Sequence, residues 1–249
     1  MTLQVVKVGS SSIVRNGAVA YENLDKLCYE VTEMGYKNRV DSVLVVSGAI
    51  PLGMLENEIR KKPTNRVDLQ SLAREGQPKL MQLYEGAFKK AGKLRVTQLL
   101  VTYHNLTTLK ERENIVNGIR HDLSKGKVPL INYNDGVDPE EAQKDNDRLA
   151  AEIAKYSNAE RMIILGTVDG VMNGSEVVTE IGEITDEIRQ LDAGAGENGT
   201  GGLTTKLEAA EIVMPEGIHF YFGNIDAGIR ALIERKNGTY FKPKSKRFL

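Results

Sequence analysis

The chain has 249 residues, of which 41% are hydrophobic and 27% charged, so it is long enough for one or two domains with a sizeable core. Its net charge of −1 argues against nucleic acid or an anionic membrane as a partner. The single cysteine, Cys28, excludes an internal disulfide, no run reaches roughly 18 apolar residues, and no leader pattern is visible, so we expect a cytoplasmic protein.

The first half of the chain alternates short β-branched runs with stretches of helical spacing. Each run that ends at turn-forming residues predicts a strand, and apolar residues three and four apart predict a helix. Gly76 and Pro78 are expected to kink or split the long second helix, and a polar segment at 50–68 to cover the site or form a subunit contact. The predicted strands are 3–8, 42–46, 96–101 and 128–132, and the predicted helices are 24–34, 69–91 and 110–124.

The second half continues the alternation. In chain order we predict a helix at 147–156, a strand at 162–165, two short strands within 176–184, a helix from 203, a strand at 219–222 and a helix at 227–235. Alternating strands and helices indicate crossover connections, and therefore an α/β fold with a mainly parallel central sheet sandwiched by helices. No repeat or proline-rich linker is present, so we expect one compact unit with two lobes.

Polar turns follow three of the predicted strands, at Gly9–Ser12, Ser47–Ala49 and Asn132–Asp135. Open α/β sheets bind ligands at the carboxyl ends of their strands, so these turns are expected to converge. A fourth segment, Gly199–Lys206, has three glycines in four residues and then opens a helix, an arrangement that favours phosphate through backbone amides and the helix end. A plain surface loop remains the alternative for that segment.

The residue types in these turns suggest phosphoryl transfer. No Ser-His-Asp context, P-loop or dinucleotide fingerprint is present, and His104, His121 and His219 lack metal-ligand spacing. Lys7 and Lys206 could grip a transferring phosphate from two sides. Two ammonium groups about 6 Å apart repel by roughly 3 kcal/mol at an effective dielectric of 20, which a carboxylate between them would offset. Asp147 is the candidate, although a role as a helix cap is open to it as well.

The motifs that carry chemistry resemble the amino-acid kinase family, in particular its glutamate 5-kinase branch. They follow the order of that family over nearly the whole chain. The matching pieces are Val6–Ser11, Val46–Ile50, Gly76-Gln77, Val128–Asn132, Asn134-Asp135, Asp145-Asn146-Asp147, Gly199–Gly202, Thr205-Lys206 and Gly238-Thr239. Members often carry an additional C-terminal RNA-binding-like domain, which is expected to be missing here.

The resemblance implies a domain of residues 1–249, with an acceptor lobe at about 1–155 and a nucleotide lobe at about 156–249. It implies phosphorylation of the side-chain carboxylate of L-glutamate by ATP, as the first step of proline biosynthesis, in a homo-oligomer. Mg²⁺ would be held mainly by the nucleotide, with no metal ligands from the protein. The implied catalytic residues are Lys7, Lys206 and Asp147, and the implied glutamate-binding residues are Ser47, Gly48, Asp135 and Asn146. The implied nucleotide and phosphate contacts are Gly9, Ser10, Gly166, Thr167, Gly199, Thr200, Gly201, Gly202 and Lys206.

Two alternatives stay open at this point. Tyr133 stands where members of the family have an acidic residue, and with the inserted Pro139-Glu140-Glu141 it favours a sibling kinase for another small acid or phosphate. Gly166-Thr167 and the segment 171–175 depart from the family's nucleotide motifs, which favours a binding protein without turnover.

Overall fold

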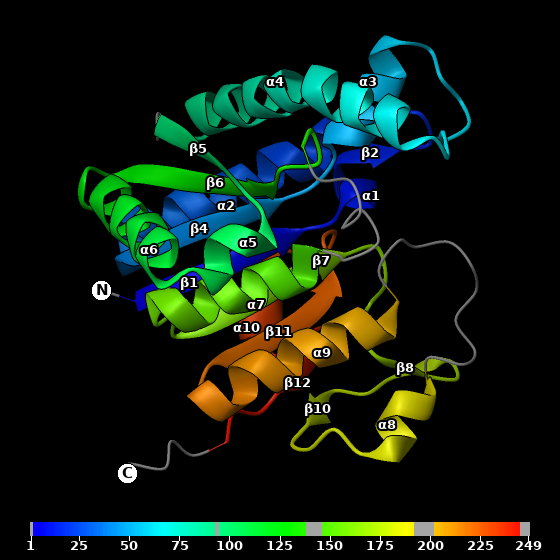
Figure 1. Cartoon of the computed structure of the whole chain (residues 1–249). Helices are drawn as coiled ribbons and strands as arrows, with labels where there is room; N and C mark the ends of the chain where they lie inside the picture. Colours follow the sequence, from blue (N-terminus) through cyan, green and yellow to red (C-terminus); the bar gives the residue numbers. More distant parts are fainter. Residues whose placement is uncertain (1, 93–94, 138–145, 192–201, 245–249) are drawn as a thin grey trace.

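A central sheet of eight strands organises the computed structural model, which describes residues 2–92, 95–137, 146–191 and 202–244 (Figure 1). Neighbouring strands are parallel except for the antiparallel pair β11–β12. Two small hairpins lie outside this sheet, β2 (Val14–Arg15) with β3 (Ala18–Val19) and β8 (Met172–Asn173) with β9 (Glu176–Val177). Across the sheet the order is β10 (Glu180–Ile181), β12 (Thr239–Phe241), β11 (His219–Asn224), β7 (Arg161–Gly166), β1 (Thr2–Val8), β4 (Val40–Val46), β6 (Lys127–Tyr133) and β5 (Arg95–Val101).

Helices cover both faces of the sheet, so its central strands are buried on both sides. Alternate residues of β1 enter different cores: Val5 packs in one cluster, and Val6 and Val8 in the other. The Val5 side is covered by α5 (Tyr103–Thr107), α6 (Leu109–Ser124), α7 (Asn146–Ser157) and α9 (Leu203–Val213). The Val6 side is covered by α1 (Ser10–Ile13), α2 (Tyr21–Asn38), α3 (Ala49–Glu56), α4 (Arg66–Ala91) and α10 (Ile229–Ile233). Helix α8 (Asp186–Gln190) and a 3₁₀ turn at Met214–Glu216 complete the described elements.

The mainly parallel, helix-sandwiched sheet confirms the predicted fold class. Three details of the prediction were wrong or missed. The segment predicted as polar begins with the apolar helix α3, in whose first turn Pro51 is tolerated. Of the two outcomes expected at Gly76 and Pro78, a kink or a split, the split is wrong, because helix α4 continues through both residues. The short strand β12 was missed, and β10 pairs with it rather than with β9.

Helices α3 and α4 cross with their backbones in close contact at two glycines. A Cβ on Gly76 would lie 1.8 Å from the carbonyl oxygen of Ala49, and a Cβ on Gly53 would lie 2.1 Å from that of Leu72. No side chain fits at either position, because both clashing atoms belong to the backbone. The two glycines therefore set how closely α4 approaches the end of β4.

Gly76→Ala is expected to lower the free energy of unfolding by about 2–3 kcal/mol, since the helices must separate to admit a methyl group. Gly86→Ala is the matched control in the same helix, because a Cβ there would meet no atom within 4 Å. That control should be neutral or stabilising by up to about 1 kcal/mol. Urea denaturation of the two variants measures the difference, and equal midpoints would contradict the crossing.

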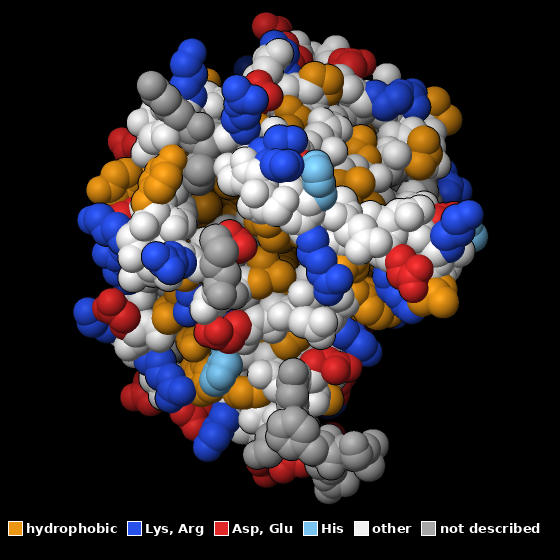
Figure 2. Space-filling model, turned by 90° about the vertical axis from the view of Figure 1, so that its left-hand side faces the viewer, with side chains coloured by type: hydrophobic (Ala, Val, Ile, Leu, Met, Phe, Trp, Pro, Cys, Tyr) orange, Lys and Arg blue, Asp and Glu red, His pale blue; other side chains and the backbone are white. Residues whose placement is uncertain are grey.

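Charges of both signs are interspersed over the face drawn in Figure 2, in keeping with the net charge of −1. Within the described residues, no helix combines the length and apolar character needed to cross a bilayer.

Candidate active site

The site is built around Lys7, which lies in the middle of the sheet. Its strand, β1, runs between β4 and β7, so Lys7 is not on a solvated edge strand. Lys7 shares the side of β1 with Val5, the side that α7 and α9 cover, because alternate residues of a strand face the same way. At this strand the chain order reverses across the sheet, the position where open α/β folds bind their ligands.

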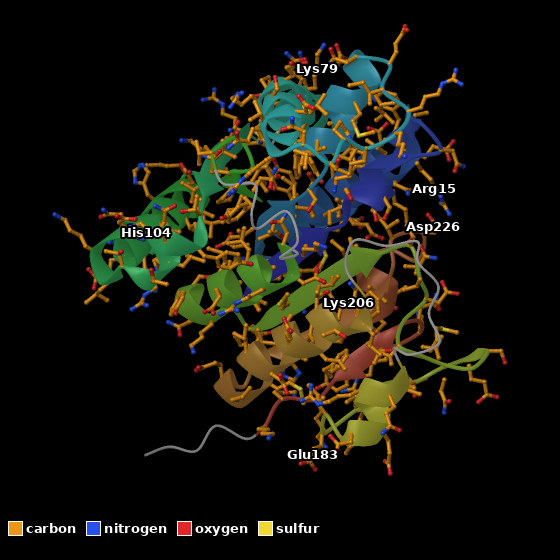
Figure 3. The ribbon with its side chains drawn as sticks, turned by 45° about the vertical axis from the view of Figure 1, so that its right-hand side comes forward. Arg15, Lys79, His104, Glu183, Lys206 and Asp226 are labelled. Carbon is orange, nitrogen blue, oxygen red and sulfur yellow. The ribbon has the colours of Figure 1, made fainter. Side chains whose placement is uncertain are left out.

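Lys7, Asp147 and Lys206 form one buried ion-pair cluster. Lys7 Nζ lies 2.7 Å from Asp147 Oδ1, and Lys206 Nζ lies 3.0 Å from Asp147 Oδ2. The Asp147 side chain has no exposed surface, and those of Lys7 and Lys206 are 6% and 10% exposed. Three elements supply the residues: the end of β1, the first turn of α7 and the first turn of α9. Figure 3 shows Lys206 well inside the molecule, whereas His104 and Glu183 lie at its periphery.

The environment keeps Asp147 ionised. Burial by itself would raise the pKa of this carboxyl, but the charges of Lys7 and Lys206 outweigh burial and hold the pKa far below its usual range. Its position in the first turn of α7 adds the favourable end of a helix dipole. A carboxylate with such a low pKa is a poor base, so its role here is to hold two cations in place.

Thr205 completes the cluster, and its side chain was not among the predicted site residues. Its hydroxyl donates to Asp147 Oδ2 over 2.9 Å and lies 3.1 Å from the carbonyl oxygen of Gly202. Lys206 Nζ donates to the same carbonyl over 3.4 Å and lies 5.5 Å from the centroid of the Phe222 ring. The start of α9 thus carries both a cation and a hydroxyl that orients its counter-ion.

A second polar group lies beside the cluster, at the ends of β4 and β6. Asn146 Nδ2 lies within hydrogen-bonding distance of Ser47 Oγ (2.6 Å), the Val46 carbonyl oxygen (3.0 Å) and Asn132 Oδ1 (3.1 Å), so its two hydrogens are shared among three acceptors. Gly48 follows with φ of +120°, a conformation that favours glycine, and turns the chain from β4 into α3. Two residues predicted to bind the acceptor, Ser47 and Asn146, are therefore in direct contact and adjoin Asp147.

Asp135, which was also predicted to bind the acceptor, lines a cavity of about 310 Å³. The cavity lies between α4 and the ends of β5 and β6, and Tyr133 and Gln77 also contribute to its wall. Tyr133 is 4% exposed, and its ring centroid is 5.5 Å from that of Tyr103. At the mouth, Arg74 donates from Nη1 to the carbonyl of Gly136 (3.1 Å). The cavity is large enough for a small amino acid.

The predicted phosphate contacts are only partly within the described residues. Gly199, Thr200 and Gly201 lie outside them, and Gly202 is the N-cap of α9. The Gly9 amide donates to the Leu165 carbonyl (3.1 Å), so this N–H continues the sheet and is not directed at a ligand. Ser10 opens α1.

Gly166 ends β7, and Thr167 follows it beside Asn224, whose side-chain amide donates to Asp169 Oδ1 (2.9 Å). The buried Thr239 contacts the loop that follows β7. Its hydroxyl accepts the Val171 N–H over 2.8 Å, and a Cβ on Gly170 would lie 2.7 Å from that hydroxyl. The Gly238-Thr239 motif therefore supports the loop from strand β12.

No group of three or more Asp, Glu, His or Cys side chains within the described ranges could hold a metal ion. Both oxygens of Asp147 already face lysines.

Comparison with known proteins gives one family match and several relatives that carry the same name. A model described as "Amino acid kinase family" matches residues 2–224. The chain is 37% identical to a protein named glutamate 5-kinase from Lactococcus lactis, over 97% of this chain and 95% of the relative. It is 31% identical to one of the same name from Clostridium acetobutylicum, with the same two coverages. The fold is also that of the carbamate kinase of Giardia, with a TM-score of 0.67 at 14% identity over 98% of this chain and 99% of that one.

Proposed function

The chain belongs to the amino acid kinase family, and on that premise we propose that it transfers the γ-phosphate of ATP to the side-chain carboxylate of L-glutamate. The observation that carries the proposal is the cluster of Lys7, Asp147 and Lys206 at the centre of the sheet. The product is γ-glutamyl phosphate, which starts proline biosynthesis, and the relatives named glutamate 5-kinase support this acceptor.

The cluster suits a reaction whose nucleophile is already ionised. A carboxylate oxygen attacks the γ-phosphorus, the bond from that phosphorus to the ADP oxygen breaks, and no proton has to be removed. Negative charge spreads over the equatorial oxygens of the transferring group. Asp147 holds Lys7 and Lys206 in fixed positions, so the two ammonium groups would stabilise that charge from two sides without moving. Electrostatic stabilisation by such preorganised groups is usually the largest single contribution to the rate.

The residues proposed to bind L-glutamate are Ser47, Gly48, Asn146 and Asp135. Ser47, Gly48 and Asn146 adjoin the cluster and would orient the reacting carboxylate. Asp135 lines the cavity and would take the α-ammonium group, because a carboxylate is the natural partner of a buried cation.

ATP is the proposed donor, and the segments after β1 and β7 and at the start of α9 would receive its phosphates. These are the segments of Ser10, of Gly166 and Thr167, and of Gly199–Gly202. Mg²⁺ would neutralise the β- and γ-phosphates and be held by their oxygens. Under this proposal the boundary between the acceptor lobe (about 1–155) and the nucleotide lobe (about 156–249) runs between the neighbouring strands β1 and β7. We further propose a cytoplasmic homo-oligomer.

Release of ADP from ATP in the presence of L-glutamate tests the proposal. Turnover with L-glutamate, and none with aspartate, N-acetylglutamate or a phosphomonoester, is the expected result. Turnover with one of the other acids alone would establish the sibling kinase that Tyr133 favours. No turnover with any acceptor, together with no rise in melting temperature at millimolar ATP, would establish a binding protein.

Thr205→Val is expected to lower kcat by about five- to tenfold, the worth of one hydrogen bond of about 1 kcal/mol to the orienting carboxylate. Thr205→Ser keeps the hydroxyl and should stay within about twofold of the wild type. Steady-state kinetics with both variants measures the effect. Equal rates for the valine and serine variants would show that the hydroxyl does not orient Asp147.

A further inference from the structure

A line of side-chain amides connects the acceptor cavity to the ion-pair cluster. Asn146, next to Asp147 in the chain, donates to Asn132 Oδ1, and Asn132 Nδ2 donates to Gln77 Oε1 over 2.8 Å. Asn132 is 2% exposed and Gln77 is 8% exposed. The line therefore runs through the interior from α7 across β6 to α4, where it ends at Gln77.

Backbone groups set the orientation of Asn146 and Asn132, and the orientation of Gln77 follows from that of Asn132. The Tyr133 N–H, which can only donate, is 2.8 Å from Asn132 Oδ1. Asn132 therefore directs Nδ2 toward Gln77, and Gln77 accepts this hydrogen bond with Oε1. This leaves Gln77 Nε2 buried, with no hydrogen-bond partner within the part of the chain that the structure describes.

An unpaired buried donor is energetically unfavourable, and an acceptor from a bound ligand would relieve that cost. Gln77 lies in the wall of the cavity that also contains Asp135. Its placement there depends on the neighbouring Gly76, whose lack of a side chain lets α4 approach Ala49 at the start of α3. The close helix crossing thus places the residue that carries the unpaired amide in the wall of the acceptor cavity.

We propose that Gln77 Nε2 donates a hydrogen bond to the α-carboxylate of the acceptor and so selects an α-amino acid with a free carboxylate. This inference rests on the proposed function. L-Glutamate has two carboxylates, and the one that is phosphorylated must reach Lys7 and Lys206. The other carboxylate lies with the α-ammonium group in the cavity, where Asp135 takes the ammonium and Gln77 the carboxylate.

Gln77→Glu tests the donor while keeping the acceptor oxygen that Asn132 requires. At pH 8.5 we expect the KM for L-glutamate to rise at least tenfold, because a donor is replaced by a second negative charge. The KM for ATP should stay within about twofold of the wild type. The increase should shrink as the pH falls, because burial raises the pKa of a carboxyl and its protonated form can donate again. Gln82→Glu makes the same change at an exposed position of the same helix, outside the cavity, and should leave all constants unchanged.

The acceptor can be altered in a complementary way. L-Isoglutamine keeps the side-chain carboxylate but carries an α-carboxamide, which can donate to the carboxyl introduced at position 77. The wild type should therefore prefer L-glutamate in kcat/KM, and Gln77→Glu should reduce that preference at least tenfold. If Gln77→Glu does not fold, as judged by its melting curve, the same ratio is measured with Gln77→Met, which removes the amide without adding charge and should also lower the preference.

The outcomes separate this inference from the function on which it rests. Suppose that the wild type turns over L-glutamate and that the Gln77 variant keeps the wild-type KM and the wild-type preference for L-glutamate over L-isoglutamine. That result overturns the role of Gln77 and leaves the proposed function standing. Absence of ADP release with L-glutamate in the wild type overturns the proposed function and this inference together.

Discussion

Lys206→Ala is expected to lower the rate of phosphoryl transfer by about 10²–10³-fold, the usual loss when one preorganised charge stabiliser is removed. Lys206 Nζ is held 3.0 Å from Asp147 Oδ2 in a nearly dry site, where its charge is poorly screened by solvent. The variant keeps Lys7 and Asp147, which explains why a residual rate should remain. The KM for L-glutamate should change much less than kcat, because the contact is made chiefly with the transferring group.

Lys155→Ala is the matched control for this experiment. Lys155 also pairs with a carboxylate, Glu216, over 3.2 Å, but both side chains are substantially exposed and lie away from the cluster. Its loss should leave kcat unchanged and cost at most about 1 kcal/mol of stability. Steady-state kinetics and melting curves on both variants give the comparison. A folded Lys206→Ala variant with a near-normal kcat would show that this lysine is not at the reacting phosphate.

Asp147→Asn is expected to lower the free energy of unfolding by about 3–5 kcal/mol at pH 7, because two buried ammonium groups lose their shared counter-charge. The rate should fall as well, since Lys7 and Lys206 then repel each other and leave their positions. Asp122→Asn is the control at a half-buried carboxylate on the surface, paired with Lys127 over 3.2 Å. It should keep full activity and lose about 1 kcal/mol or less.

The same variant carries a prediction for pH. The folded-state pKa of Asp147 lies well below that of the unfolded chain, because the lysine charges outweigh burial. Its contribution to stability is therefore complete above the unfolded pKa of about 4 and is lost as pH falls toward the folded pKa. Melting temperatures from pH 7 to pH 3 should show the wild type losing its advantage over Asp147→Asn in the acid range. A difference that stays constant with pH would mean that Asp147 is not the ionised partner of both lysines.

Much of the fold was predictable from the sequence, because it is encoded locally. Buried strands such as 3–8 and 42–46 are continuous apolar runs, and helices such as α7 show apolar residues at regular spacing. The elements that the sequence did not predict depend on contacts between distant parts of the chain. Helix α3 contains one proline and one glycine, which lower its local helix propensity, and it forms because Gly53 and Gly76 let it pack on α4. Strand β12 has three residues and exists only through its pairing with β10 and β11.

The candidate residues of the site were also indicated by sequence, since each stands near the end of a predicted strand, in a polar or glycine-rich segment, or at the start of a predicted helix. Their mutual contacts were not. Asp147 and Lys206 are separated by 59 positions, and Thr205 and Gln77 gain significance only from atoms on other elements. The Gly9 amide shows the opposite case. Its sequence context suggested a contact with phosphate, but in the structure it donates to the Leu165 carbonyl.

By itself, then, the sequence determined the alternation of strands and helices, the lysines and carboxylate available for chemistry, and the turns that carry them. Only the tertiary structure decided that β1 lies between β4 and β7, which of its faces α7 and α9 cover, and hence that Lys7 and Lys206 share Asp147. It also decided that Gln77, whose buried Nε2 has no partner within the described residues, lies in the wall of the cavity. The reason is that local pattern depends on neighbours within one turn or strand, whereas a buried ion pair depends on strand order and helix packing across the whole chain.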